Sequence, residues 1–261
     1  MIKRVRVIPV LSLIDGQLVK TINFKKPNYL GDPINAIKIF NDKEVDELVV
    51  LDIRASLNKT EPNYTLIKEM AGECFMPMAY GGNIYSIEVA HKVFELGVEK
   101  IILNTSLQNN IKLAKEISLN YGEQSVVASL DIKNSFFGKQ KLYFKSASKN
   151  FKLNILEYCN YLIDNGVGEI IVNNIDNEGT FRGYDIDLIS KISQNVSIPV
   201  IALGGASSLD DFVSVIKDGY ASAVAASSLF VYKNNDPQSI LINYPSQKDL
   251  KTNLYSKLNY E

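Results

Sequence analysis

The chain has 261 residues, a formal net charge of −1 and 22% charged residues, which suits one compact α/β domain or two small ones. The near-zero charge argues against a protein held to nucleic acid by bulk electrostatics. His91 is the only histidine, which excludes multi-histidine metal sites, and Ser-His-Asp or Cys-His catalysis unless His91 is the base. Cys74 and Cys159 form neither a CxxC pair nor a disulfide framework, which favours a reducing, cytoplasmic location.

The two ends of the sequence predict neither export nor a membrane anchor. The basic opening MIKRVRVIPVLSL is interrupted by Pro9 and Ser12 and lacks a cleavage site of small residues, so a signal peptide is not expected. No segment reaches the roughly 20 apolar residues of a membrane span. Residues 234–261, rich in Asn and Lys, predict an exposed terminal helix or a frayed end.

Short apolar runs alternate with longer amphipathic segments along the chain. The runs are rich in Val and Ile, and they predict parallel strands buried on both faces. They cover residues 5–11, 47–51, 76–80, 100–104, 125–130, 169–173, 199–203 and 222–226. Helix signals lie between them, such as the N-cap Asp32 before Pro33 and the C-terminal Gly97. The most clearly bounded helices are residues 34–44, 86–96 and 208–218. Eight βα units predict a (β/α)8 barrel, with a doubly wound sheet as the alternative.

An internal repeat favours the barrel. The segments VDELV at 45–49, PMAYGG at 77–82 and NTSL at 104–107 parallel VGEII at 167–171, PVIALG at 199–204 and ASSL at 226–229, each displaced by 122 residues. Ser12 and Asp131 occupy matching places displaced by 119 residues, so one early loop differs in length. Two halves, about residues 1–122 and 123–232, predict one closed barrel with pseudo-two-fold symmetry, followed by a C-terminal segment at 233–261.

Loops of the same kind recur in both halves, where a barrel carries its active site at the C-terminal ends of the strands. Glycine lets backbone N–H groups approach an anion closely, so the repeated glycine pairs predict two phosphate sites on opposite sides of the mouth. The alternative is that the glycines only make tight turns. The predicted phosphate-binding residues are Gly82, Asn83, Asn104, Thr105, Gly179, Gly204, Gly205, Ala226 and Ser227.

Three ionisable residues are expected at the same mouth. Asp131 ends the fifth strand, Asp52 ends the second, and Lys20 lies in the loop after the first. A carboxylate at a strand end is costly unless it is hydrogen-bonded or functional. Asp131 is therefore the predicted general acid/base, with a turn-capping aspartate as the alternative. Asp176 belongs to a turn or helps to hold the second phosphate, and His91 is expected outside the site.

The opposite end of the barrel is also charged. Arg6, Glu47, Lys100 and Glu169 open the first, second, fourth and sixth strands, and their side chains are expected to form a ring of alternating charge at the barrel floor. By spacing alone, the favoured interpretation is a capped floor that serves stability.

These residues resemble the HisF family, the cyclase subunit of imidazole glycerol phosphate synthase. The resemblance extends to about Tyr232. The matching stretches are RVIPVLSLIDGQLVK, GDPINAIKIF, VDELVVLDIRAS, YGGNI, LGVEKIILNTSL, QSVVASLDIK, GVGEIIVNNIDNEGTFRGYD, PVIALGGASS and AVAASSLF. The sister isomerase HisA shares the half-barrel repeat. The Asn104–Thr105 pair and the charged floor, however, resemble HisF.

The resemblance implies a substrate with a phosphate at each end and a heterodimeric partner, the glutaminase HisH, docked at the barrel floor. Ammonia from glutamine would pass the charged gate and cross the barrel to the mouth. There, two catalytic aspartates close the imidazole ring and release an aminoimidazole carboxamide nucleotide. Asp131 and Lys20 match catalytic positions of the family, while Glu99 and Gln124 fall where it meets the glutaminase. No cluster of residues indicates a metal or redox cofactor.

Several positions at the mouth depart from the family pattern. Ser12 replaces the first catalytic aspartate, and no histidine is available to make it a comparable base. We therefore expect cyclase activity to be weak or absent. The other departures are Val10 for cysteine, Asn83 for glycine, Leu203 for a small polar residue and Glu178 for aspartate.

An intact floor beside an altered mouth resembles a HisF-like paralogue group encoded with surface-polysaccharide or flagellin-glycan genes. The segments FKKPNYLGDPINAI, GECFMPMAYGG and ILINYPS are similar to that group. The resemblance implies that the barrel passes ammonia from a HisH-like glutaminase to a sugar amidotransferase, which converts an acetamido into an acetamidino group. One alternative is a genuine cyclase that tolerates Ser12. The other is a HisA-like isomerase, which would also require a carboxylate at that position.

Overall fold

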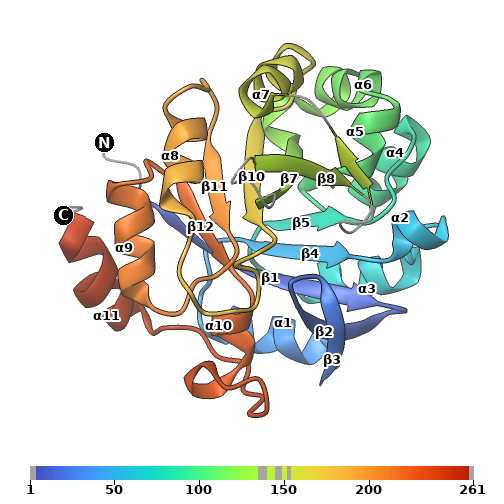
Figure 1. Ribbon diagram of the computed structural model, residues 1–261. Helices are drawn as coiled ribbons and strands as arrows, with labels where there is room; N and C mark the ends of the chain where they lie inside the picture. Colours follow the sequence, from blue (N-terminus) through green and yellow to red (C-terminus); the bar gives the residue numbers. More distant parts are fainter. Residues whose placement is uncertain (1–3, 135–139, 145–148, 152–153, 259–261) are drawn as a thin grey trace.

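A computed structural model describes residues 4–134, 140–144, 149–151 and 154–258, and these fold into a closed (β/α)8 barrel (Figure 1). Each parallel strand pairs with the next, and the barrel closes because β1 pairs with both β4 and β12. The barrel strands are β1 (Arg6–Ile14), β4 (Leu48–Asp52), β5 (Met78–Gly81), β6 (Lys100–Leu103), β7 (Val126–Asn134), β10 (Glu169–Asn174), β11 (Val200–Leu203) and β12 (Ala223–Ala226). The predicted barrel is thereby confirmed.

Helices cover the outside of the barrel, and their ends follow the capping residues of the sequence (Figure 1). The Asp32 carboxylate accepts hydrogen bonds from the backbone N–H groups of the first turn of α1, and Ser208 and Asp211 form a capping box at α9. The helices are α1 (Pro33–Asp42), α2 (Ala55–Asn58), α3 (Tyr64–Glu73), α4 (Ile87–Glu95), α5 (Thr105–Asn109), α6 (Lys112–Tyr121), α7 (Ile155–Asp164), α8 (Ile186–Ser193), α9 (Leu209–Lys217), α10 (Ser228–Val231) and α11 (Gln247–Leu250). In the described chain, no helix is long and apolar enough to cross a membrane.

Two barrel strands continue into antiparallel extensions that the sequence analysis did not predict. β1 turns at Asp15 and Gly16, whose φ angles of 50° and 78° suit a tight hairpin turn, into β2 (Gln17–Ile22) and β3 (Lys25–Gly31). Lys20 therefore lies on a strand, and its placement in a loop was wrong because the Asp-Gly turn allows the chain to pair back on β1. β7 continues similarly into β8 (Gln140–Phe144), which pairs with β9 (Lys149–Phe151).

The inside of the barrel is a separate apolar core. It is filled by small and branched side chains that alternate with residues facing the helices. The buried members of this inner core are Ile8, Val10, Val49, Ala79, Ile102, Val127, Ile171, Ile201, Leu203, Ala223 and Ala225. The charged floor and the mouth therefore lie at opposite ends of an apolar interior.

The described part of the C-terminal segment ends in helical turns and exposes most of its residues, as one of the two expectations had it, but a few buried side chains pack it on the barrel. Tyr244 is 2% exposed and its hydroxyl donates to the backbone oxygen of Val7 at 3.1 Å. Leu250 and Leu254 are fully buried, and the Arg4 guanidinium lies 4.3 Å from the centre of the Tyr255 ring. These apolar residues are scattered among many Asn and Lys residues, so the overall composition of the segment did not predict that they would be buried.

Candidate functional site

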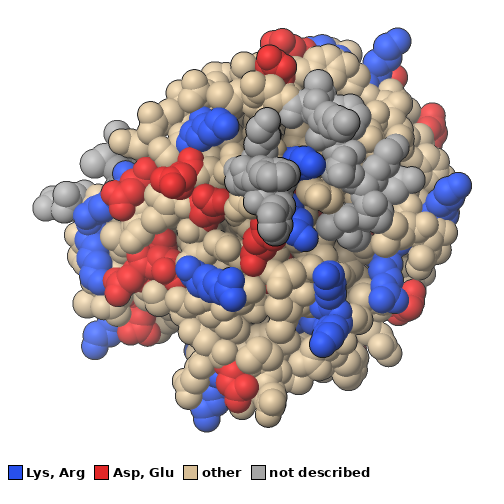
Figure 2. Space-filling view, in the orientation of Figure 1, with Lys and Arg blue, Asp and Glu red and all other residues tan. Residues whose placement is uncertain are grey.

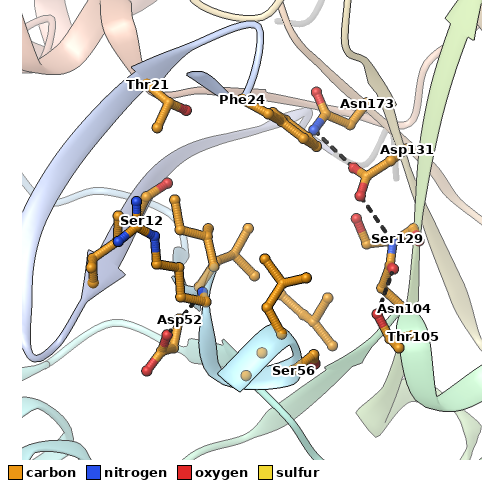
Figure 3. A pocket seen from close by; sticks show the side chains of 18 of the residues that line it. Ser12, Thr21, Phe24, Asp52, Ser56, Asn104, Thr105, Ser129, Asp131 and Asn173 are labelled. Carbon is orange, nitrogen blue, oxygen red and sulfur yellow. Dashed lines mark hydrogen bonds between the residues drawn. The ribbon is translucent and has the colours of Figure 1, made fainter. Parts of the chain in front are cut away.

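A cavity of about 490 Å³ opens at the C-terminal ends of the barrel strands. Figure 3 shows Asp131, Asn173, Asn104, Ser129 and Thr105 along one wall of this mouth cavity, with Ser12 and Asp52 across from them and Ser56 at the lower edge of the view. The strands bring these residues together from distant parts of the chain because all their C-terminal ends meet at this edge. The size of the mouth cavity and its mixed polar and apolar lining are typical of a small-molecule binding site.

Asp131 on β7 is held between two amides. The side-chain nitrogens of Asn104 and Asn173 each donate to a different carboxylate oxygen of Asp131 at 3.1 Å (Figure 3). Burial outweighs these stabilising hydrogen bonds and raises the pKa of Asp131 to about 7. A carboxyl group with such a pKa can accept or release a proton at neutral pH, which suits general acid/base chemistry. The catalytic role assigned to Asp131 remains a prediction.

Ser12 lies across the mouth cavity from Asp131 (Figure 3). The cavity lining contains no histidine that could activate its hydroxyl. The single histidine, His91, lies on α4, where its Nδ1 atom is 2.5 Å from the Tyr121 hydroxyl. The expected position of His91 outside the site is confirmed.

The carboxylate of Asp52 lies at the C-terminal end of β4. It accepts hydrogen bonds from the backbone N–H groups of Arg54 and Ala55 at 3.2 and 3.0 Å, while burial raises its pKa. Asp176 likewise accepts a hydrogen bond from the backbone N–H of Asn134 at 2.8 Å. These bonds give both aspartates a role in holding loops at the mouth.

Lys20 is buried behind the mouth and does not line the cavity. Its ammonium group forms an ion pair with the Glu178 carboxylate and donates to the backbone oxygen of Thr21 at 2.9 Å. Glu178 itself lines the cavity, so Lys20 is connected to the cavity wall through this ion pair. Direct participation of Lys20 in catalysis remains a prediction.

The first predicted phosphate loop borders the mouth cavity through Gly82, Asn83, Asn104 and Thr105. A Cβ atom at Gly82 would lie 2.8 Å from both Asp52 Cβ and the Tyr80 hydroxyl, so only glycine fits there. Asn83 has a φ of 52°, and its side-chain amide donates to the Thr60 backbone oxygen at 2.8 Å. Asn83 thus takes the left-handed conformation of glycine while its amide is bound outside the cavity.

The second predicted phosphate loop surrounds a much smaller pocket of about 10 Å³. Gly204 and Gly205 have φ angles of 99° and 105°, which glycine adopts without strain. This second pocket is lined by Glu178, Gly179, Gly204, Gly205, Ala206, Ala226, Ser227 and Ser228. The structure therefore brings the predicted residues together, and phosphate binding at either loop remains a prediction.

The four charged residues of the floor meet in one network. The Arg6 guanidinium forms ion pairs with both Glu47 and Glu169. The Lys100 ammonium lies 2.9 Å from a carboxylate oxygen of each glutamate, so every carboxylate has two cationic partners. The glutamate side chains are only 4% and 6% exposed, and the network closes the end of the inner core opposite the mouth.

The two residues predicted to meet a partner are exposed on this floor. Glu99 precedes β6 and accepts a hydrogen bond from the Met78 backbone N–H at 2.7 Å. Gln124 precedes β7 and donates to the Tyr121 backbone oxygen at 3.0 Å. Both are accessible beside the charged network, and their contact with a glutaminase remains a prediction.

The sequence analysis missed several residues of the mouth. Asn173 lies next to Asp131 near the C-terminal end of β10, and the strand-end rule that selected Asp131 could have found it. Phe24, Lys25 and Lys26 line the cavity from the unpredicted hairpin, and Arg54 lines it from the segment after β4. No sequence signal placed the hairpin over the mouth.

The fold and the site define a (β/α)8-barrel protein with a buried carboxyl group, Asp131, at its mouth and a closed charged network at its floor. The profile of the family described as "Histidine biosynthesis protein" matches residues 6–235, so the chain belongs to this family. Within it, the relatives place the chain among the HisF-type subunits of imidazole glycerol phosphate synthase, which confirms the predicted family.

Three relatives illustrate the similarity. A Pseudomonas aeruginosa protein, provisionally named imidazole glycerol phosphate synthase subunit hisF2, is 48% identical over 250 residues, covering 96% of this chain and 99% of that protein. A Vibrio vulnificus protein, provisionally named subunit hisF3, is 42% identical and covers 95% of each chain. Subunit HisF of Alkaliphilus metalliredigens is 34% identical over 227 residues, covering 87% of this chain and 90% of its own.

Proposed function

We propose that this chain is the barrel subunit of a glutamine amidotransferase complex and receives ammonia from a HisH-like glutaminase docked on its floor. The observation that carries this proposal is the network of Arg6, Glu47, Lys100 and Glu169 at the end of an apolar core. Buried charges contribute little net stability compared with apolar residues of similar size, so stability is a weak reason for such a network.

The chemistry of ammonia fits this arrangement. Neutral ammonia can cross an apolar interior, whereas ammonium would have to leave its hydration shell. In the closed network Lys100 bridges the two glutamates, so a passage requires that its ammonium move away from at least one of them. Lys100 is the suitable moving part because its side chain is a flexible stem, while Arg6 is a planar fork fixed to both carboxylates.

The mouth supports ammonia transfer better than full cyclase chemistry. Asp131 is a suitable acid/base group, but the residue across the cavity is Ser12. Loss of one member of an acid/base pair typically lowers the rate by about 10²–10⁴. We therefore propose that the ammonia is used by a further enzyme, a cytoplasmic sugar amidotransferase that forms an acetamidino group on a surface-glycan sugar. The provisional names hisF2 and hisF3 support a paralogue role.

The proposal is tested with the barrel, a HisH-like glutaminase and a sugar amidotransferase together. Glutamine labelled with ¹⁵N in its amide is supplied beside unlabelled ammonium chloride, and the isotope in the product is measured by mass spectrometry. Channelled ammonia gives mostly ¹⁵N product. Lys100→Met and Glu169→Gln should raise the unlabelled fraction, while Lys191→Met on the exposed face of α8 should not. Unchanged labelling in the floor variants, or no complex with the glutaminase, would contradict the proposal.

The second candidate is a genuine cyclase that forms imidazole glycerol phosphate, favoured by the pKa of about 7 at Asp131. It is tested by incubating the folded protein with the doubly phosphorylated ribulosyl intermediate and ammonium chloride, beside an active HisF. Turnover near that control would establish a synthase subunit. No turnover, with a gain in Ser12→Asp, would identify the missing carboxylate as the cause. No gain in that variant would count against a hidden cyclase site.

A further inference from the structure

The inner end of the mouth cavity is formed by the apolar core of the barrel. Val10, Ile102 and Leu203 belong to the inner core and also line the cavity, so ammonia that crosses the core emerges there. Amines in water are protonated at neutral pH, and a protonated amine has no free electron pair with which to attack a carbon atom. The ammonia therefore stays reactive only if the enzyme that accepts it covers the mouth.

Exposed apolar side chains lie around this opening. Leu57 on α2 and Pro27 on β3 are exposed and also line the cavity, which they approach from two different segments of the chain. Tyr85, after β5, is exposed as well but does not line the cavity, so a small molecule bound inside would leave its ring in water. Exposed apolar and aromatic side chains grouped at one opening are typical of a protein interaction site.

Positive charge surrounds the same apolar side chains. In the hairpin and in the segment that follows β4, residues 15–31 and 53–63, the exposed cations are Lys25, Lys26, Arg54 and Lys59. None of them takes part in the ion pairs found among the described residues, and Figure 2 shows basic side chains over the hairpin. The exposed acidic residues of the two segments are only Asp15 and Glu61. The charge extends beyond the cavity, because Lys59 does not line it.

Hydrogen bonds hold these segments in place. The Tyr85 hydroxyl donates a hydrogen bond to the Glu61 carboxylate and so ties the loop after β5 to the segment after α2. At the tip of the hairpin, the Asn23 backbone N–H donates to the Glu178 backbone oxygen at 2.9 Å, which ties the hairpin to the loop after β10. A surface that is already ordered loses little conformational entropy when a partner docks on it.

We infer that the mouth rim, formed by Lys25, Lys26, Arg54, Leu57, Lys59 and Tyr85, is the docking surface for the enzyme that accepts the ammonia. The surface of this partner is acidic and has an apolar patch, which complement the cations and the apolar side chains of the mouth rim. The inference rests on the proposed function and adds to it the place and the chemistry of a second protein contact. Because the glutaminase would dock on the floor, both partners can bind the barrel at the same time.

Docking is measured by biolayer interferometry between the barrel and the sugar amidotransferase used in the isotope experiment. We expect the affinity to fall as salt is raised, since the contact joins opposite charges. Lys26→Glu and Lys59→Glu should each weaken binding by about tenfold or more, because each places a like charge against the acidic partner. Leu57→Ser should weaken it about tenfold by removing an apolar contact. The matched controls are Lys191→Glu on α8 and Leu119→Ser on α6, which alter exposed residues outside the mouth rim and should change affinity less than about twofold.

A second measurement separates this inference from the proposed function. The same variants are tested for binding to the HisH-like glutaminase and for free ammonia released when all three proteins hydrolyse glutamine together. The mouth-rim variants should bind the glutaminase normally and release more free ammonia than the controls. A glutaminase that does not bind the barrel would contradict the proposed function. A glutaminase that binds, with an amidotransferase that binds the mouth-rim variants as tightly as the controls or does not bind the barrel, would overturn this inference alone. Circular dichroism checks that each variant is folded.

Discussion

The ammonium group of Lys20 on β2 pairs with the carboxylate of Glu178, 158 residues later in the chain. Their side chains are 1% and 11% exposed, so the pair is largely withdrawn from water. It joins the first hairpin to the loop after β10 and thereby fixes the arrangement of the mouth. A residue predicted to act in catalysis thus has a clear structural partner.

Lys20→Met should lower the free energy of unfolding by about 3–5 kcal/mol, because it leaves the Glu178 carboxylate buried without its cation. The double variant Lys20→Met, Glu178→Met should recover part of this loss, since no unpaired charge remains. Urea unfolding measures both. Lys257→Met is the control, because its ion pair with Asp210 is exposed and should contribute at most about 1 kcal/mol. Equal losses in Lys20→Met and the control would show that the pair is not held in solution.

Asp131 should make stability depend on pH. Its pKa is about 7 in the folded protein against a usual value of 3.8, so the folded state retains a proton that the unfolded chain releases. The free energy of unfolding therefore falls as pH rises through this window, by about 4 kcal/mol from this group alone. We expect the stability of Asp131→Asn relative to the original protein to increase between pH 5 and pH 8 in urea unfolding. A difference that is constant with pH would show that Asp131 ionises in its usual range.

Gly205→Ala should destabilise the second glycine loop by about 3 kcal/mol, because its φ is unfavourable for alanine and overpacking adds to the strain. The added Cβ atom would lie 2.2 Å from the Gly183 backbone oxygen, at a φ of 105°. Gly72→Ala is the matched control. Gly72 lies within α3 with no atom within 4 Å of an added Cβ, so alanine should stabilise the protein by about 0.5–1 kcal/mol. Thermal or urea unfolding that gives both variants the same sign would contradict this assignment.

Tyr244 should anchor the C-terminal segment. Tyr244→Phe removes the hydrogen bond to the Val7 backbone oxygen and should cost about 1 kcal/mol, while Tyr244→Ala also leaves a cavity and should cost about 3–5 kcal/mol. Tyr220→Phe is the control, since Tyr220 is 58% exposed. The measurement is urea unfolding. A Tyr244→Ala variant as stable as the control would show that the segment does not pack in solution.

The barrel could be predicted from the sequence because the features that indicate it recur at regular intervals along the chain. Three features constrain the topology independently: eight apolar runs, helix caps such as Asp32, and a repeat displaced by 122 residues. The barrel is the arrangement that satisfies all three. The strand-end rule then placed Asp131, Asn104 and the glycine loops at one mouth, which the structure brings together.

The features that only the tertiary structure revealed are in segments of the chain that do not belong to the internal repeat. The hairpin after β1 has no counterpart in the predicted pattern, so the sequence could not show that Lys20 pairs with Glu178 or that Lys25 and Lys26 line the cavity. The C-terminal segment similarly concealed its buried Tyr244 among polar residues. The repeat and the strand periodicity are local properties of the chain and can be read in order. An ion pair between residues 158 positions apart, or a carboxyl pKa set by burial, depends on which surfaces meet after folding.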